Sequence, residues 1–153
     1  MKKGIVCFVL ALVLGISFVA SSFAETVYPK YDPQGGSSTK SFSNAHVKHK
    51  YITSSITKRS SNEYGSYAWD RDVSVKVNSV SIPAQTEFKI TLVDPNGNAV
   101  GSNKPWSEPG TKKLTLYSDR TNIPKIALEL RNVYRKGEIV ASGSFTGCYD
   151  LVG

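Results

Sequence analysis

The two histidines, His46 and His49, are the first candidates for chemistry, because imidazole is a common metal ligand. They stand in the stretch HVKH. A spacing of three places both rings on one face of a helix, whereas on a strand the two rings diverge. Lys48 and Lys50 would also repel a cation, and no cysteine or carboxylate stands close to them in the sequence. We therefore expect no metal site and no cofactor.

A second candidate is the stretch DPNGNA, where Asp94, Asn96 and Asn98 have the spacing that opens a calcium loop. The pattern then requires a glycine where Ala99 stands and a glutamate where Pro105 stands. A hairpin turn explains the Asp-Pro-Asn-Gly stretch without a metal ion. The turn is the interpretation that we adopt.

Nucleophilic catalysis would need a serine, threonine or cysteine beside a base that a third group orients. The chain has no G-x-S-x-G stretch, and Cys148 has no histidine near it in the sequence. We expect no catalytic residue and a protein that is not an enzyme. Cys148 is then expected to be covered, because free cysteine is among the most buried residue types.

The basic residues are unevenly distributed along the chain. Between Asp32 and Glu63 there is no acidic residue, and this acid-free segment holds both histidines together with Lys40, Lys48, Lys50, Lys58 and Arg59. Lysines on an exposed edge strand protect a sheet from pairing with another chain. The same charges could instead form a footprint for an anionic polymer or a membrane surface. Both interpretations stay open.

Aromatic residues could add specificity to such a footprint. Trp106 stands in the stretch NKPWSEPG, a predicted loop, where it either caps the end of the domain or stays exposed for a partner. Tyr67 and Trp69 could stack on sugar rings, but we favour a place in the core because large aromatic side chains dominate core packing. The candidate ligand-binding residues are Lys40, His46, Lys48, His49, Lys50, Tyr51, Lys58, Arg59 and Trp106.

The N-terminus has the composition of a secretory signal peptide. A basic start, Met1-Lys2-Lys3, precedes an apolar run over residues 5–20, and the small residues Ser22 and Ala24 suit a cleavage site. The run is shorter than the roughly 20 residues that a membrane span needs. We expect a signal peptide over residues 1–24 and a secreted bacterial protein, extracellular or wall-associated, with no membrane span after processing.

The elements that must position these residues are strands. Residues 25–44 are rich in Ser, Gly and Pro and are predicted to be a flexible arm. From 45 to 153, apolar residues alternate with polar ones, which predicts strands over residues 46–57, 67–77, 86–93, 112–117, 125–130 and 139–147. Arg71 interrupts the apolar set and predicts a bulge in WDRD. About seven strands indicate an all-β antiparallel sandwich, immunoglobulin-like or jelly-roll-like.

The expected function is binding at a cell surface by a secreted β-sandwich. Its expected partner is an anionic envelope polymer, a lipid headgroup or a wall glycan, and we expect a monomer. Nucleic acid is not expected, since no recognition helix, zinc finger or RNP motif is present. The stretch SFSNAHVKHKYITSSI resembles the His-, Tyr- and Thr-rich strands of small lactococcin-type bacteriocins, without a shared fixed motif. That resemblance implies the alternative, a secreted antibacterial protein or toxin.

Overall fold

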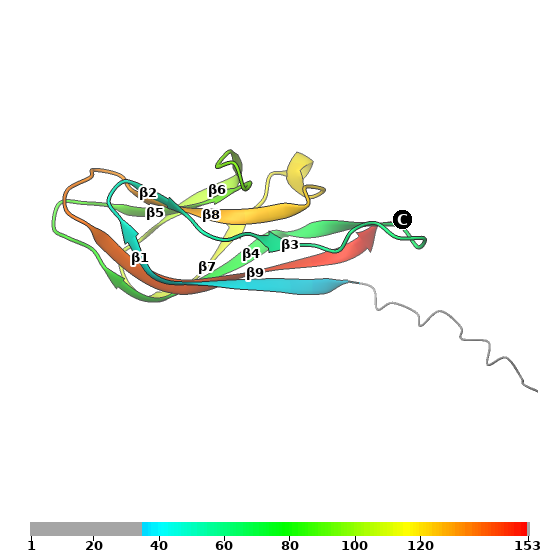
Figure 1. Ribbon diagram of the computed structural model, residues 1–153, viewed down its shortest axis with the longest axis horizontal. Coiled ribbons are helices and arrows are strands. Elements are labelled where there is room, and N and C mark those ends of the chain that lie inside the picture. The colour runs from blue at the N-terminus through cyan, green and yellow to red at the C-terminus, as the bar shows by residue number, and fades with distance from the viewer. Residues whose placement is uncertain (1–34, 153) are drawn as a thin grey trace, which may run out of the picture. The chain divides into compact units, whose positions relative to one another are not determined.

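Two antiparallel sheets pack face to face in the computed structural model, which describes residues 35–152 (Figure 1). The elements are β1 (Gly36–Val47), β2 (Lys50–Ile52), β3 (Ile56–Thr57), β4 (Ser66–Ser81), β5 (Phe88–Val93), β6 (Ala99–Trp106), β7 (Gly110–Thr115), the 3₁₀ turn η1 (Ser118–Arg120), β8 (Lys125–Asn132) and β9 (Ile139–Val152). The first sheet has the order β1-β9-β4-β7 and the second has the order β2-β8-β5-β6, with β3 also paired to β8. The predicted all-β sandwich is confirmed.

Some predictions concern parts of the chain outside the described residues. The signal peptide over residues 1–24 and the first part of the arm, residues 25–34, are among them. Within residues 35–152, no helix has the length and apolar character needed to cross a membrane.

Strand β4 shows how the alternating sequence builds the core. Tyr67, Trp69 and Val73 point inward and are buried, whereas Arg71 is exposed. The register of β4 against β9 shifts between Trp69 and Val73, which confirms the predicted bulge. The extra residues turn Arg71 outward, where its Nε donates to the carbonyl oxygen of Leu116 at 3.4 Å.

Large aromatic side chains close one part of the core, as predicted for Tyr67 and Trp69. Both rings meet Tyr149 of β9 edge to face, with centroid distances of 5.8 and 5.5 Å. The indole Nε1 of Trp69 donates to the carbonyl oxygen of Ile123 at 2.8 Å, so its one polar group is satisfied inside the protein. These two residues therefore stabilise the sandwich and offer no stacking surface.

The first strand begins earlier than predicted. Residues 36–44 belong to β1, so the prediction of a flexible arm up to residue 44 is wrong for this part. Thr39 and Ser41 are exposed and stand opposite Thr146 and Ser144 of β9, and Thr39 and Thr146 share a hydrogen bond of 2.8 Å between their Oγ1 atoms. Phe42 and Ala45 are buried on the opposite face. This serine-rich sequence thus pairs with β9 as a strand, and the matched hydroxyls contribute to the pairing.

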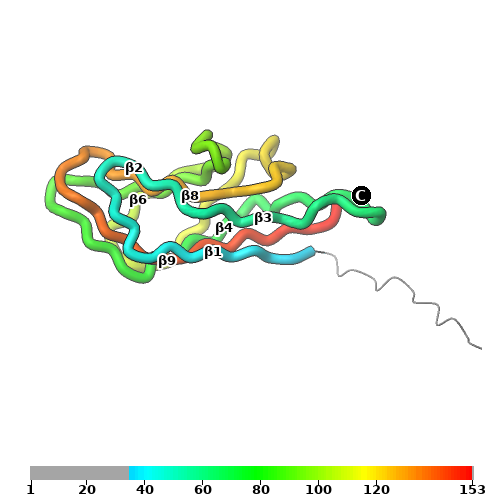
Figure 2. The backbone as a smooth tube through the Cα atoms, in the orientation of Figure 1, coloured from blue at the N-terminus to red at the C-terminus, as the bar shows by residue number. Residues whose placement is uncertain are grey.

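The predicted strand over residues 46–57 is divided among three elements. The chain leaves the first sheet after Val47, turns through Lys48 and His49, and enters the second sheet as β2 and then β3 (Figure 2). The predicted loop around Trp106 is in part strand β6, where Pro105 is tolerated because β6 lies at the edge of the second sheet. Residues 35–152 contain nine strands, where about seven were expected.

Cys148 is exposed, and the prediction that it is covered is wrong. Strand β9 keeps its alternation to the end, with Phe145, Gly147 and Tyr149 on the inner face. A Cβ atom on Gly147 would lie 2.9 Å from the Cδ1 of Ile56 and 3.0 Å from the ring of Trp69, so glycine allows the strand to pass these side chains without a bulge. The thiol therefore points outward.

Candidate functional site

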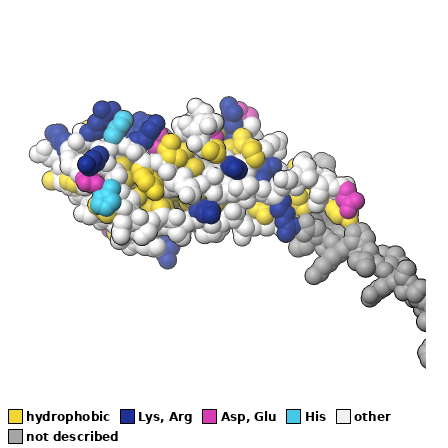
Figure 3. Space-filling view, viewed as in Figure 1, with side chains coloured by type: hydrophobic (Ala, Val, Ile, Leu, Met, Phe, Trp, Pro, Cys, Tyr) yellow, Lys and Arg dark blue, Asp and Glu magenta, His cyan; other side chains and the backbone are white. Residues whose placement is uncertain are grey.

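Two turns lie side by side at one end of the sandwich. The first connects β1 to β2, and the second, residues 133–138, connects β8 to β9. The backbone N–H of Asn132 donates to the carbonyl oxygen of His49 at 2.8 Å, which ties the two turns together. Their cations and those of the adjoining strands form a surface that we name the basic end; its residues are Lys48, His49, Lys50, Arg131, Arg135 and Lys136. Figure 3 shows both histidines and several Lys and Arg side chains gathered at this end.

A buried amide holds the second turn in place. Asn132 is fully buried, and its Nδ2 donates to the carbonyl oxygens of Gly137 at 2.9 Å and Val47 at 3.4 Å. Its Oδ1 accepts from the backbone N–H of Arg135 at 2.9 Å and from the hydroxyl of Thr86. One side chain thus links the turn, the end of β1 and the β4–β5 connection, so the cations of this turn stand on a fixed backbone.

The two histidines have different partners. The Nδ1 of His46 lies 2.7 Å from Oε1 of Glu138. The Nε2 of His49 accepts a hydrogen bond of 2.8 Å from Nη2 of Arg135, since a guanidinium can only donate. Neither ring shares a partner with the other, and residues 35–152 contain no group of three His, Cys, Asp or Glu side chains that could hold a metal ion. His49 thus contacts a cation of the basic end, Arg135, and His46 contacts Glu138 beside it.

Three cations stand in one row across the outer face of the second sheet. Arg131 of β8 is directly opposite Lys50 of β2 and directly opposite Lys89 of β5. Residues opposite one another on antiparallel strands have Cβ atoms roughly 4.5–5.5 Å apart, and like charges in such positions are destabilising. Lys89 is relieved by Glu87, whose Oε1 lies 3.1 Å from its Nζ. The other two cations of the row, Arg131 and Lys50, share another carboxylate.

That carboxylate is Glu129, and it is buried although it lies on an outer face. It stands two positions before Arg131 on β8, with only 4% of its surface exposed. Its Oε1 accepts from Nε of Arg131 at 2.7 Å, and its Oε2 lies 3.7 Å from Nζ of Lys50. One carboxylate thus serves two cations. The group lies in a polar hollow of about 290 Å³ lined by Lys89, Thr91, Val93, Gly97, Ala99, Asn103, Glu129 and Arg131.

A hairpin stands at the edge of this hollow. Its turn is the Asp94–Asn98 stretch, and Asp94 accepts hydrogen bonds from the backbone N–H groups of Asn96 and Asn98 at 2.8 and 2.9 Å. The side-chain hydrogen bond from Asn98 is the largest cause that holds the pKa of the Asp94 carboxyl below its ordinary value. Gly97 has φ of +85°, as expected for the predicted hairpin turn.

Several predicted site residues lie away from the basic end. Lys40 is exposed on β1, but it stands seven positions before Val47, which is roughly 20 Å along an extended strand. Thr57 is opposite Lys125 at the start of β8, so Lys58 and Arg59 follow at the far end of that strand from Arg131. The acid-free segment therefore does not form one continuous patch.

Lys58 and Tyr51 also differ from the expected ligand contacts. The ammonium of Lys58 donates to the carbonyl oxygen of Tyr67, and partial burial lowers the pKa of this lysine. Its charge is used inside the fold. Tyr51 is exposed, and it lies on β2 directly opposite the buried Leu130, so its ring stands at the rim of the sandwich next to Lys50.

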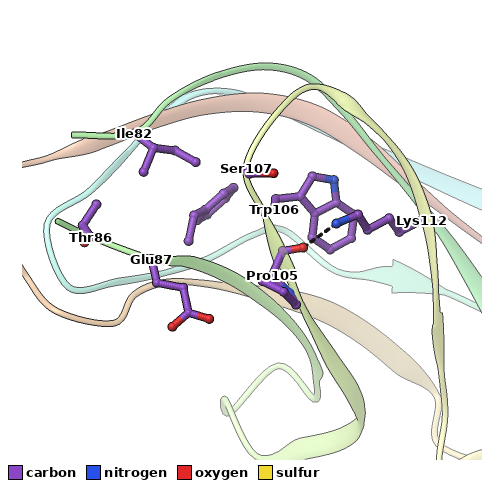
Figure 4. Close-up of a pocket in the computed structure, with 8 residues that line it drawn as sticks. Ile82, Thr86, Glu87, Pro105, Trp106, Ser107 and Lys112 are labelled. Atoms are coloured by element: carbon purple, nitrogen blue, oxygen red, sulfur yellow. Dashed lines mark hydrogen bonds between the residues drawn. The ribbon is translucent and has the colours of Figure 1, made fainter. Parts of the chain in front are cut away.

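Trp106 is buried. Of the two predicted alternatives, it caps the end of the domain and does not stay exposed. Only 2% of its surface is exposed. The Nζ of Lys112 lies 4.9 Å from the centroid of the Trp106 ring and donates to the carbonyl oxygen of Pro105 at 2.6 Å. The indole forms one wall of a cavity of about 390 Å³, with Ile82 and Glu87 across from it (Figure 4). Because the cation covers the ring, Trp106 is not free to stack on a ligand.

The sequence interpretation missed the cations that β8 and its turn contribute. Arg131, Arg135 and Lys136 follow a clear strand signal, in the stretch RNVYRKGE, but they are far from the acid-free segment in the sequence. Only the pairing of β2 with β8 brings them beside Lys50. The sequence does show three cations around a predicted turn. It does not show the strand order, which brings these cations beside Lys50.

Comparisons with known proteins leave the family of this chain open. No family model matches it, and no curated protein matches it. Among solved structures, the crystal structure of FLHE is similar over 78% of this chain and 99% of that one, with 9% sequence identity and a TM-score of 0.43. At that level the similarity carries no argument about function.

Proposed function

We propose that this protein is a secreted, non-enzymatic sandwich that binds an anionic component of a cell envelope through its basic end. The observation that carries the proposal is the convergence of Lys48, Lys50, Arg131 and Arg135 from two parts of the chain onto one fixed surface. All four side chains are exposed. An exposed surface of one sign attracts a polyanion and raises its local concentration.

The charge balance supports this assignment. The basic end carries Lys48, Lys50, Arg131, Arg135 and Lys136 as cations, and the carboxylates bonded to it or beside it are Glu129 and Glu138. An excess of positive charge remains after these pairs are counted. Edge protection places lysines on an edge strand such as β2, whereas here the cations also come from the inner strand β8 and from two turns.

Co-sedimentation with isolated cell envelopes tests the proposal. We expect the wild-type protein to sediment with envelopes at low salt and to be released at high salt, because the screening length falls to about 10 Å at 0.1 M. The variant K48Q/K50Q/R131Q/R135Q should stay in solution. Its matched control, K76Q/K104Q/K113Q/K125Q, removes four exposed cations elsewhere and should sediment like the wild type.

Equal losses in the two variants would contradict the proposal, because total charge and not its placement would then govern binding. Growth inhibition of bacteria by the purified protein would instead support the antibacterial alternative.

A further inference from the structure

The row of cations on the second sheet has a feature that a diffuse patch of charge does not need. Arg131 is held by Glu129 through its Nε atom, at 2.7 Å, while 48% of the Arg131 side chain remains exposed. Among the residues that the structure describes, Glu129 is the one hydrogen-bond partner of the Arg131 guanidinium. The two terminal nitrogens, Nη1 and Nη2, are thus left for a partner from outside.

Burial of Glu129 makes this arrangement directional. Its side chain is 5% exposed, so the carboxylate is fixed by packing. A hydrogen bond between a carboxylate and Nε fixes the plane of the guanidinium and sets its terminal edge away from the carboxylate. That edge carries two parallel N–H donors, which match the two oxygens of a carboxylate or phosphate group.

The neighbours of Arg131 complete the site. Lys50 and Lys89 flank it in cross-strand register, one on each side. The next row places Thr91 opposite Glu129 and Asn103 opposite Thr91, so hydroxyl and amide groups line the adjoining hollow. The opposing charges are Glu129 itself and Glu87, which lies 3.1 Å from Lys89. Lys50 and Arg131 share one carboxylate between them, and an incoming anion would relieve the remaining positive charge.

We propose that Arg131, oriented by Glu129 and flanked by Lys50 and Lys89, binds one oxyanion group of the ligand in a bidentate manner. This inference rests on the proposed function and adds the chemistry by which the ligand is recognised. The shared ligand chemistry is a carboxylate or phosphate oxyanion, whether it belongs to a free ion, an acidic polysaccharide or a lipid headgroup. Glu129 is a positioning residue, and Arg131 makes the contact.

Conservative variants distinguish bidentate binding by an oriented guanidinium from attraction by charge alone. Arg131→Lys keeps the charge and loses the fork, so we expect about tenfold weaker binding. Glu129→Leu removes a negative charge, which would strengthen anion binding if charge alone mattered. The proposal predicts the reverse, a loss of affinity, because the guanidinium is no longer oriented. Arg120→Lys is the matched control, since Arg120 is exposed in η1 and should leave affinity unchanged.

Titration calorimetry with inorganic phosphate, polygalacturonate and phosphatidylglycerol vesicles provides the measurement. A loss for Arg131→Lys on all three probes supports recognition of the shared oxyanion, and a loss on one probe supports the proposal and identifies the source. If Arg131→Lys binds all three probes as tightly as the wild type, the proposal is overturned, even if Glu129→Leu fails to fold. If Arg131→Lys is unchanged while K48Q/K50Q/R131Q/R135Q loses binding, the oriented fork fails and the proposed function stands. If the wild-type protein binds none of the probes and no envelope, both fail.

Discussion

The outer faces of the two sheets arrange their charged side chains differently. On the first sheet, hydroxyl side chains stand opposite one another on β1, β9 and β4: Ser41 beside Ser144, and Thr39 and Ser74 on either side of Thr146. The cations of this face, Lys76 and Lys113, stand opposite Ser144 and Ser74 and not opposite one another. On the second sheet, cations stand directly opposite one another on β2, β8 and β5. Both faces cover the same core, so the demands of the fold alone do not explain the difference.

The cross-strand pairs on the two outer faces differ in their energies. Opposed hydroxyls can satisfy one another, as Thr39 and Thr146 do, and such pairs stabilise a sheet. Opposed cations repel, and on the second sheet Lys50, Arg131 and Lys89 stand in one row with two carboxylates, Glu129 and Glu87, to offset the repulsion. One positive charge of this row remains after these pairs are counted, and we propose that a bound anion offsets it. The comparison supports our proposal that the ligand binds at the second sheet.

The largest expected effect concerns Asn132, which fixes the backbone of the basic end. Asn132→Ala should lower the free energy of unfolding by about 2–3 kcal/mol, because it leaves buried backbone groups without partners. Urea denaturation measures the change. Asn103→Ala is the control on an exposed strand position, with an expected change within about 0.5 kcal/mol. Similar losses in both variants would show that Asn132 has no special role in fixing the turn.

The next prediction concerns the first sheet. Cys148 is exposed on its outer face, opposite Ser37 of β1, so its thiol should react with an alkylating reagent in the folded protein nearly as fast as in denaturant. Mass spectrometry of the labelled chain measures the rate, and Cys148→Ser separates its signal from that of Cys7. Protection until denaturant is added would mean that a segment or a second molecule covers this face.

The smallest effect is expected at the hairpin beside the polar hollow. Hydrogen bonding, first from the Asn98 side chain, lowers the pKa of Asp94 in the folded protein below its ordinary value of 3.8. A carboxyl with a lowered pKa stabilises the fold above its unfolded pKa, and this stabilisation is lost as the pH falls through the folded pKa. Asp94→Asn should therefore be slightly less stable than the wild type at pH 6, and the difference should fade below pH 3.8. Thermal unfolding at several pH values checks this; a constant difference would be contrary to it.

The strands were predictable wherever one face is buried. Alternation over residues 67–77 and 125–130 predicted β4 and β8, and the interruption at Arg71 predicted the bulge. Residues 36–44 were missed because serines and threonines pair by hydroxyl contacts, which leave no apolar period. Cys148 was wrongly predicted to be covered, because the preference of free cysteine for burial was given more weight than the alternation of the strand.

Only half of the basic end could be predicted. Lys48, His49 and Lys50 were visible as part of a segment without acids, but Arg131 and Arg135 join them through the pairing of β2 with β8. Strand order is set by long-range packing, so no local pattern contains it. The same limit applies to Glu129, whose neighbours on β2 and β5 are Ile52 and Thr91 and whose ion pairs are with Lys50 and Arg131.

Salt dependence of binding tests the central claim most directly. For the wild-type protein and polygalacturonate, the logarithm of the association constant should fall linearly with the logarithm of salt concentration, because bound counterions are released from a polyanion. The slope should flatten in K48Q/K50Q/R131Q/R135Q and stay unchanged in K76Q/K104Q/K113Q/K125Q. Equal slopes in the two variants would contradict a function located at the basic end of the second sheet.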